Sequence, residues 1–171
     1  MTIQTVNGHT PRLGRSVFVA PTATVAGDVV VGDRASIWYG CVVRCEEQRI
    51  EIGEETNIQD LSVIHVTNKR FGTRIGARVT VGHRVVLHAC TVSDLCLIGI
   101  GSIILDQAVI GSETIIAAGS VVTPGTQIPP RVLALGSPAR VKRPLTDQEL
   151  EHIRWNAADY VKLAGMHGRG A

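Results

Sequence analysis

Aliphatic residues open successive six-residue units along most of the chain, and glycine often follows them. Examples are VAGDVV (25–30), VGDRAS (31–36) and VGHRVV (81–86), and the series runs on to VTPGTQ (122–127). This period predicts an all-β solenoid, in which each unit forms one short strand and one corner and three units complete a triangular coil. A βαβ fold would need helical patterns between the strands, and none is visible before residue 146.

The remaining segments complete one expected domain of 171 residues. We expect an N-terminal lead-in over 1–16, the solenoid over 17–135, an exit loop over 136–145, a helix over 146–165 and a flexible tail over 166–171. Thr146 and Glu149 have the spacing of a capping box at the helix start. Apolar residues at helical spacing follow, and Gly165 is expected to end the helix.

Composition excludes several classes of protein. The formal net charge is +2, which gives no reason to expect a nucleic-acid partner. No apolar run approaches the length of a membrane span, and the first residues, MTIQTVNGHTPRLG, contain no apolar signal core. We therefore expect no membrane association and a cytoplasmic protein. The four cysteines form no CxxC pair, which favours small buried residues over a zinc ribbon or redox motif.

Three histidines lie where the six-residue repeat is interrupted. The unit from Ile64 takes eleven residues, IHVTNKRFGTR, and the stretch between Val81 and Val92 is one residue short of two units. Counting sides of the prism places His65 and His88 on one side, one coil apart, with strands stacked at roughly 4.8 Å. His83 lies on the preceding side of the prism, across a corner, and its side chain is expected to face another direction.

If such prisms pack around a threefold axis, His83 of one chain can meet His65 and His88 of the next. A three-histidine site would then form at each subunit interface. Three neutral imidazoles suit Zn2+ with a fourth position open for water, and Fe2+ or Co2+ are alternatives. A bound cation lowers the pKa of water to about 7, which predicts attack by metal-bound hydroxide on an electrophilic carbon. Surface histidines, or histidines bonded to backbone carbonyls, are the simpler alternative.

The sequence resembles the γ-class carbonic anhydrases of the hexapeptide-repeat superfamily. The motifs that carry the resemblance are VVRCE (42–46), TNIQDLSVIHV (56–66), VGHRVVLHACTV (81–92) and GSPAR (136–140). The resemblance implies that the solenoid is a left-handed parallel β-helix with a C-terminal α-helix. It also implies a homotrimer with interfacial metal sites and reversible hydration of CO2 to bicarbonate, and the activity is expected to be weak.

The resemblance also implies roles for other residues. Arg44 and Asp60 match an intersubunit salt bridge that also helps to bind bicarbonate, although an ordinary surface ion pair is an alternative. Gln59 matches a glutamine that hydrogen-bonds the metal-bound water, the alternative being an outward polar residue. Tyr160 matches a tyrosine that approaches the metal pocket, the alternative being simple packing of the helix.

The expected proton shuttle is altered in this chain. Some family members carry a shuttle glutamate shortly after the first histidine, whereas VTNKRFGTR (66–74) contains no acidic residue. Glu46 and Glu47 fall near another acidic position of the family, and Glu47 is the better match by spacing. Two other functions stay open, the first because the same solenoid hosts it and the second because of this departure. One is an acyl-CoA transferase, and the other is a metal-binding homologue with weak activity or with thioesterase-type hydrolase activity.

Overall fold

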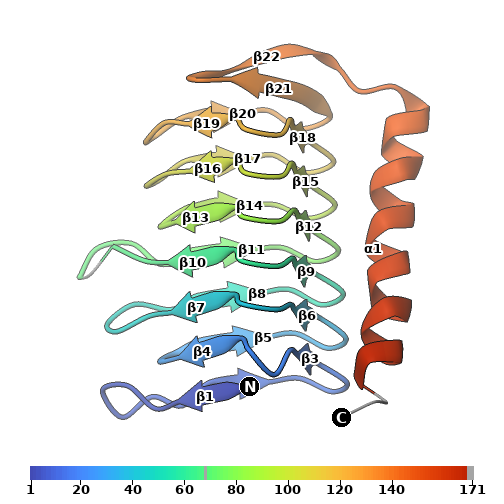
Figure 1. Ribbon diagram of the computed structural model, residues 1–171. Helices are drawn as coiled ribbons and strands as arrows, with labels where there is room; N and C mark the ends of the chain where they lie inside the picture. The colour runs from blue at the N-terminus through green and yellow to red at the C-terminus, as the bar shows by residue number, and fades with distance from the viewer. Residues whose placement is uncertain (68, 169–171) are drawn as a thin grey trace.

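The computed structural model describes residues 1–67 and 69–168 of the chain. These residues wind into a left-handed parallel β-helix of about seven coils, and α1 (Asp147–His167) stands along one side of the stack (Figure 1). Three sheets form the sides of the prism. Apart from the last strand, which pairs antiparallel with the strand before it, all their strands are parallel and each third strand in the sequence belongs to the same sheet. The predicted solenoid with one C-terminal helix is therefore confirmed.

Each sheet is defined by its strands in order along the stack. The first sheet contains β1 (Thr2–Gln4), β4 (Thr24–Ala26), β7 (Val42–Arg44), β10 (Val63–His65), β13 (Val86–His88), β16 (Ile103–Ile104) and β19 (Val121–Val122). The second contains β2 (Arg12–Leu13), β5 (Val29–Val31), β8 (Ile50–Ile52), β11 (Thr73–Ile75), β14 (Thr91–Val92), β17 (Val109–Ile110) and β20 (Gln127–Ile128). The third contains β3 (Phe18–Val19), β6 (Ser36–Ile37), β9 (Asn57–Ile58), β12 (Thr80–Val81), β15 (Leu97–Ile98), β18 (Ile115–Ile116), β21 (Val132–Gly136) and β22 (Ala139–Pro144).

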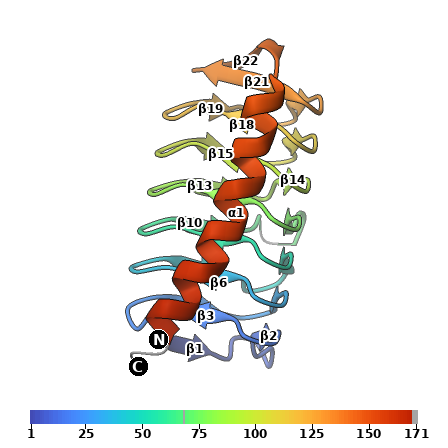
Figure 2. The same cartoon turned by 90° about the vertical axis from the view of Figure 1, so that its right-hand side faces the viewer.

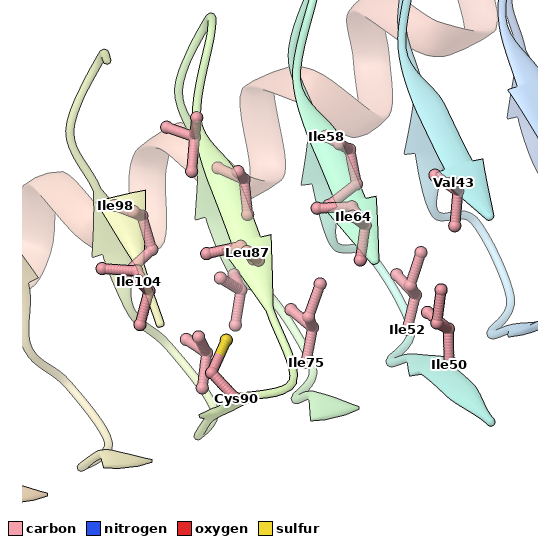
Figure 3. Packing of buried hydrophobic residues seen from close by; sticks show 14 of the residues in the cluster. Val43, Ile50, Ile52, Ile58, Ile64, Ile75, Leu87, Cys90, Ile98 and Ile104 are labelled. Atoms are coloured by element: carbon pink, nitrogen blue, oxygen red, sulfur yellow. The ribbon is translucent and has the colours of Figure 1, made fainter. Parts of the chain in front are cut away.

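The core is a set of aliphatic stacks that run along the axis of the prism. Val43, Ile64, Leu87 and Ile104 occupy paired positions on four successive strands, and all four are fully buried (Figure 3). Each side chain of this kind contributes about 1.5–3 kcal/mol when it is removed from water. These stacks hold the register of the strands, because a slip of one residue would turn the stack outward.

Both ends of the solenoid differ from the expected boundaries. Strands β1 and β2 pair with β4 and β5, so residues of the expected lead-in already form a coil. The expected exit loop instead contributes to an antiparallel hairpin of β21 and β22. This hairpin closes one edge of the third sheet, and its outer strand, ARVKRP, carries the basic residues that discourage edge-to-edge pairing.

The C-terminal helix packs along the third sheet. It runs from the β22 end of the stack toward β3 (Figure 2), and it contacts β3, β6, β9 and β12. The predicted capping box of Thr146 and Glu149 is present. The predicted stop at Gly165 is wrong, because α1 continues to His167 before Gly168 caps it. The expected flexible tail thus loses Met166 and His167 to the helix, and residues 169–171 lie outside the described residues.

Candidate functional site

His65 and His88 meet on the outer face of the first sheet. They end strands β10 and β13, and they occupy paired positions in the register of those strands. Nδ1 of His65 lies 3.2 Å from Nε2 of His88. The placement predicted by counting coils is therefore confirmed by the strand register.

A carboxylate contacts the far side of each ring in this pair. Glu46 Oε2 lies 3.2 Å from Nε2 of His65, and Asp106 Oδ1 lies 2.6 Å from Nδ1 of His88. We call these four residues the paired-histidine cluster. When both outer nitrogens donate to carboxylates, neutral rings direct the lone pairs of their inner nitrogens toward each other. Such an arrangement favours a cation between the two rings.

The electrostatics of His65 favour the neutral ring that a metal requires. Burial, together with the positive charges of Arg44 and His88, lowers the pKa of His65. Burial raises the pKa of Asp106, but hydrogen bonds from Thr67 and His88 outweigh burial and hold that pKa below its usual value. Asp106 is therefore an ionised acceptor for His88 at neutral pH.

His83 lies apart from this cluster, at the corner between the third and first sheets. Its Nδ1 is 2.9 Å from Asp60 Oδ2, so the Nε2 atom is left for another partner. Asp60 and His83 come from successive coils at the same corner, where the Arg84 amide donates to the Asp60 carbonyl. The corner therefore presents one imidazole with a carboxylate behind it.

Gln59 and Tyr160 lie beside the same corner. Gln59 is buried, and its amide donates to Asn57 Oδ1 over 3.1 Å. Tyr160 packs edge-on against Trp38, with ring centroids 5.4 Å apart. Burial raises the pKa of Tyr160, and the nearby charge of Asp60 adds to that rise. We call Gln59, Asp60, His83 and Tyr160 the corner cluster.

The remaining predicted site residues are Arg44 and Glu47. Arg44 forms an ion pair with Glu46 of its own chain, next to His65. Glu47 is exposed, and within the described part of the chain Glu46 is the glutamate that contacts a site histidine. Sequence spacing favoured Glu47. Spacing alone cannot show which of two adjacent carboxylates a corner turns toward the sheet.

The donor set of the paired-histidine cluster fits a metal ion. Two imidazole ligands on tetrahedral zinc, each about 2.0–2.1 Å from the metal, have nitrogens roughly 3.3 Å apart. The 3.2 Å separation of the two ring nitrogens matches that value. Over residues 1–67 and 69–168, however, no three His, Cys, Asp or Glu side chains of one chain are grouped to hold a metal. Of the three predicted ligands, one chain therefore brings only His65 and His88 together, and His83 lies apart from them.

Sequence reasoning missed Asp106. Asp106 follows β16, in a stretch, ILDQAV, that has the pattern of an ordinary six-residue unit. Its signal was its distance from His88, because 18 residues separate them and three six-residue units make one coil. A carboxylate one coil after a candidate ligand is thus placed to contact it.

Exposed apolar side chains lie beside the two clusters. Leu61 and Ile100 are each 55% exposed, and Val63 is 38% exposed. Leu61 and Ile100 occupy corner turns, and Val63 lies on β10 two residues before His65. Exposed apolar residues gathered beside polar site residues are typical of a surface that another protein chain covers.

Comparisons with known proteins place the chain in a family. Residues 10–45 match the family model described as bacterial transferase hexapeptide (six repeats). A carbonic anhydrase of Geobacillus kaustophilus is 46% identical over 91% of this chain and 85% of its own. Gamma carbonic anhydrase 2, mitochondrial, of Arabidopsis thaliana is 43% identical over 97% of this chain, which spans 62% of the plant protein's length.

A solved structure agrees with this placement. A hexapeptide transferase family protein from Anaplasma phagocytophilum superposes with a TM-score of 0.91 at 39% identity, covering 95% of this chain and 96% of its own. The fold and the histidine arrangement define a left-handed β-helix protein of the hexapeptide-repeat class. Within that class, the chain belongs to the γ-carbonic anhydrase family.

The structure also bears on the expected absence of membrane spans. Among the described residues, no helix combines the length and the apolar character that crossing a bilayer requires. The helix α1 instead contacts the third sheet and buries Leu150, Ile153, Ala157 and Ala164.

Proposed function

We propose that this protein is a γ-type carbonic anhydrase that hydrates CO2 reversibly to bicarbonate at sites between subunits of a homotrimer. The observation that carries this proposal is the division of the predicted residues into two clusters on one chain. The paired-histidine cluster offers two facing imidazoles, and the corner cluster offers a third imidazole with a glutamine and a tyrosine. Threefold packing would place the corner cluster of one subunit against the histidine pair of the next.

His65, His83 and His88 are the proposed ligands of a divalent cation, most simply Zn2+, with Fe2+ or Co2+ as alternatives. When bound, the cation would lower the pKa of a water molecule to about 7 and supply the nucleophile for CO2. Asp106 Oδ1 lies 2.6 Å from Nδ1 of His88, and Asp60 Oδ2 lies 2.9 Å from Nδ1 of His83. Both contacts use Nδ1 and would leave Nε2 to hold the cation.

The other residues of the site would bind, orient and move protons. Gln59, whose amide nitrogen is already held by Asn57, would use its side-chain oxygen to orient the attacking water. Arg44 would hold bicarbonate or pair with Asp60 of the neighbouring subunit, and the hydroxyl of Tyr160 would donate to the same anion. Glu46 Oε2 contacts His65 and is placed to take up the released proton, while a shuttle role for Glu47 stays a prediction.

The test is stopped-flow CO2 hydration by protein whose metal content has been measured, beside a His88→Ala variant. Activity that rises with metal content and disappears in His88→Ala would support the proposal. His152→Ala is the matched control, because His152 lies on α1 and bonds to Asn156 away from both clusters. A fully metallated protein without hydration activity would contradict the proposed reaction and leave the metal site in place.

Two other functions remain as candidates. The resemblance to a hexapeptide transferase family protein keeps an acyl-CoA transferase open. Selective binding of acetyl-CoA to the native protein would raise its melting temperature, and this proposal expects no such rise. The absence of acidic residues in VTNKRFGTR keeps a metal-dependent thioesterase open, and thioester hydrolysis by the metallated protein would reveal it.

A further inference from the structure

The segment after His65 departs from the six-residue repeat, yet it brings no acidic residue to the site. In the structure this segment is fastened to both histidines of the pair. The Thr73 hydroxyl donates to the carbonyl oxygen of His65. At the other end, the Thr67 hydroxyl donates to Asp106 Oδ2, and Asp106 Oδ1 faces Nδ1 of His88.

Thr67 is itself held by the backbone of the same segment. Its amide bonds to the carbonyl of Phe71, and the amide of Phe71 bonds back to Thr67. The two carboxylate oxygens of Asp106 are thus divided between a fixed hydroxyl and the imidazole of His88. With both oxygens engaged, the carboxylate cannot rotate away from the ring without breaking a hydrogen bond.

We propose that Asp106, held in place by Thr67, is the positioning residue that fixes the Nδ1-protonated tautomer and the orientation of His88 for metal binding. This inference rests on the proposed metal site and assigns a task to the departure after His65. That segment stabilises the metal ligands through Thr67 in place of supplying a proton shuttle. A carboxylate behind a ligand imidazole increases its basicity toward the metal, and its loss typically costs 10- to 100-fold in metal affinity.

The experiment compares metal retention and ligand geometry in Asp106→Ala, Asp106→Asn and Thr67→Val. Protein loaded with Zn2+ is mixed with a chromogenic chelator to measure the rate of metal release. A second sample loaded with Co2+ gives a visible spectrum that reports the ligand geometry. We expect metal affinity to fall roughly 10- to 100-fold in Asp106→Ala. Asp106→Asn, which keeps a neutral acceptor, and Thr67→Val should show smaller losses in the same direction, with shifted Co2+ bands.

Asp94→Asn is the matched control, because Asp94 also occupies a corner turn and accepts a hydrogen bond from a backbone amide, that of Ala77. It should change neither metal release nor the Co2+ spectrum. A general loss of folding would lower the melting temperature without a graded change in the spectrum.

Two further results separate the inference from the proposed function. If His88→Ala loses the metal while Asp106→Ala releases it at the wild-type rate, the positioning role is wrong and the metal site stands. If His88→Ala retains the metal with an unchanged Co2+ spectrum, the proposed metal site is wrong, and the role of Asp106 falls with it.

Discussion

Nδ1 of His65 lies 3.2 Å from Nε2 of His88, although 23 residues separate the two histidines in the sequence. The β-helix produces this contact, because one full coil returns the chain to the neighbouring strand of the same sheet. The interval exceeds three six-residue units by the five residues that the first break adds. The five added residues therefore lengthen the loop between two coils without changing the contact between the two histidines.

The apolar surface beside the two clusters is expected to be a subunit interface. Val63→Asp would place a charge in that interface, where it finds no partner, and should dissociate the trimer and release the metal. Leu13→Asp is the control, because Leu13 is 37% exposed, close to the 38% of Val63, but lies on the second sheet. Sedimentation velocity with metal analysis measures both effects. Equal dissociation of both variants, or of neither, would contradict this placement of the interface.

The cysteine thiols are expected to be unreactive in the folded protein. Burial raises the pKa of Cys41 to about 11 and the pKa values of Cys90 and Cys96 to about 12. Because the thiolate is the reactive form, these three thiols should not react with a disulfide reagent at about pH 8. After unfolding in guanidinium, all four cysteines of the chain should react. Rapid reaction of the folded protein would indicate accessible thiols and contradict this expectation.

The capping box of α1 should make stability depend on acid pH. A hydrogen bond from Arg143, followed by one from the Thr146 amide, lowers the pKa of Glu149 from 4.5 to about 2. Since the folded-state pKa is the lower one, the stabilisation is present above pH 4.5 and is lost as the pH falls toward 2.

Glu149→Gln tests this dependence through melting temperatures across that range. The variant should be less stable than the wild type at neutral pH, and the difference should shrink as the pH falls. Arg154 pairs with Glu151 on the same helix, so Glu151→Gln is a suitable control with an exposed carboxylate. A difference that stays constant with pH would show that the charge of Glu149 does not stabilise the helix start.

The repeat made the histidine pair predictable, because a fixed period converts sequence distance into position around the prism. The same arithmetic extends to Asp106, which lies one coil of 18 residues beyond His88. It was missed because carboxylates are common at corners, and the repeat alone does not say which ones turn toward a neighbouring ring. Sequence spacing could not show that Glu46 contacts His65, since the direction of a corner side chain depends on local backbone angles.

The ends of the solenoid were harder to predict than its middle. Strand β1 carries no glycine-marked repeat, and the lead-in holds a single aliphatic–glycine pair, Leu13–Gly14 at β2, so the sheet partners of both strands become visible only in three dimensions. The segment around β22 contains prolines and basic residues that are typical of loops, yet it pairs with β21 and protects a sheet edge. At the helix start, by contrast, Thr146 and Glu149 are three residues apart, so the local sequence was enough to predict the capping box.

The most direct test of an intersubunit site is complementation between two variants in mixed trimers. His83→Ala lacks the corner ligand, and the double variant His65→Ala with His88→Ala lacks the pair. Each should bind no metal and show no CO2 hydration alone. Any mixed trimer joins one intact pair to one intact corner, so it should regain roughly one metal ion per trimer and the matching activity. If mixed trimers regain neither metal nor activity, while a wild-type sample treated identically keeps both, the metal site does not lie between subunits.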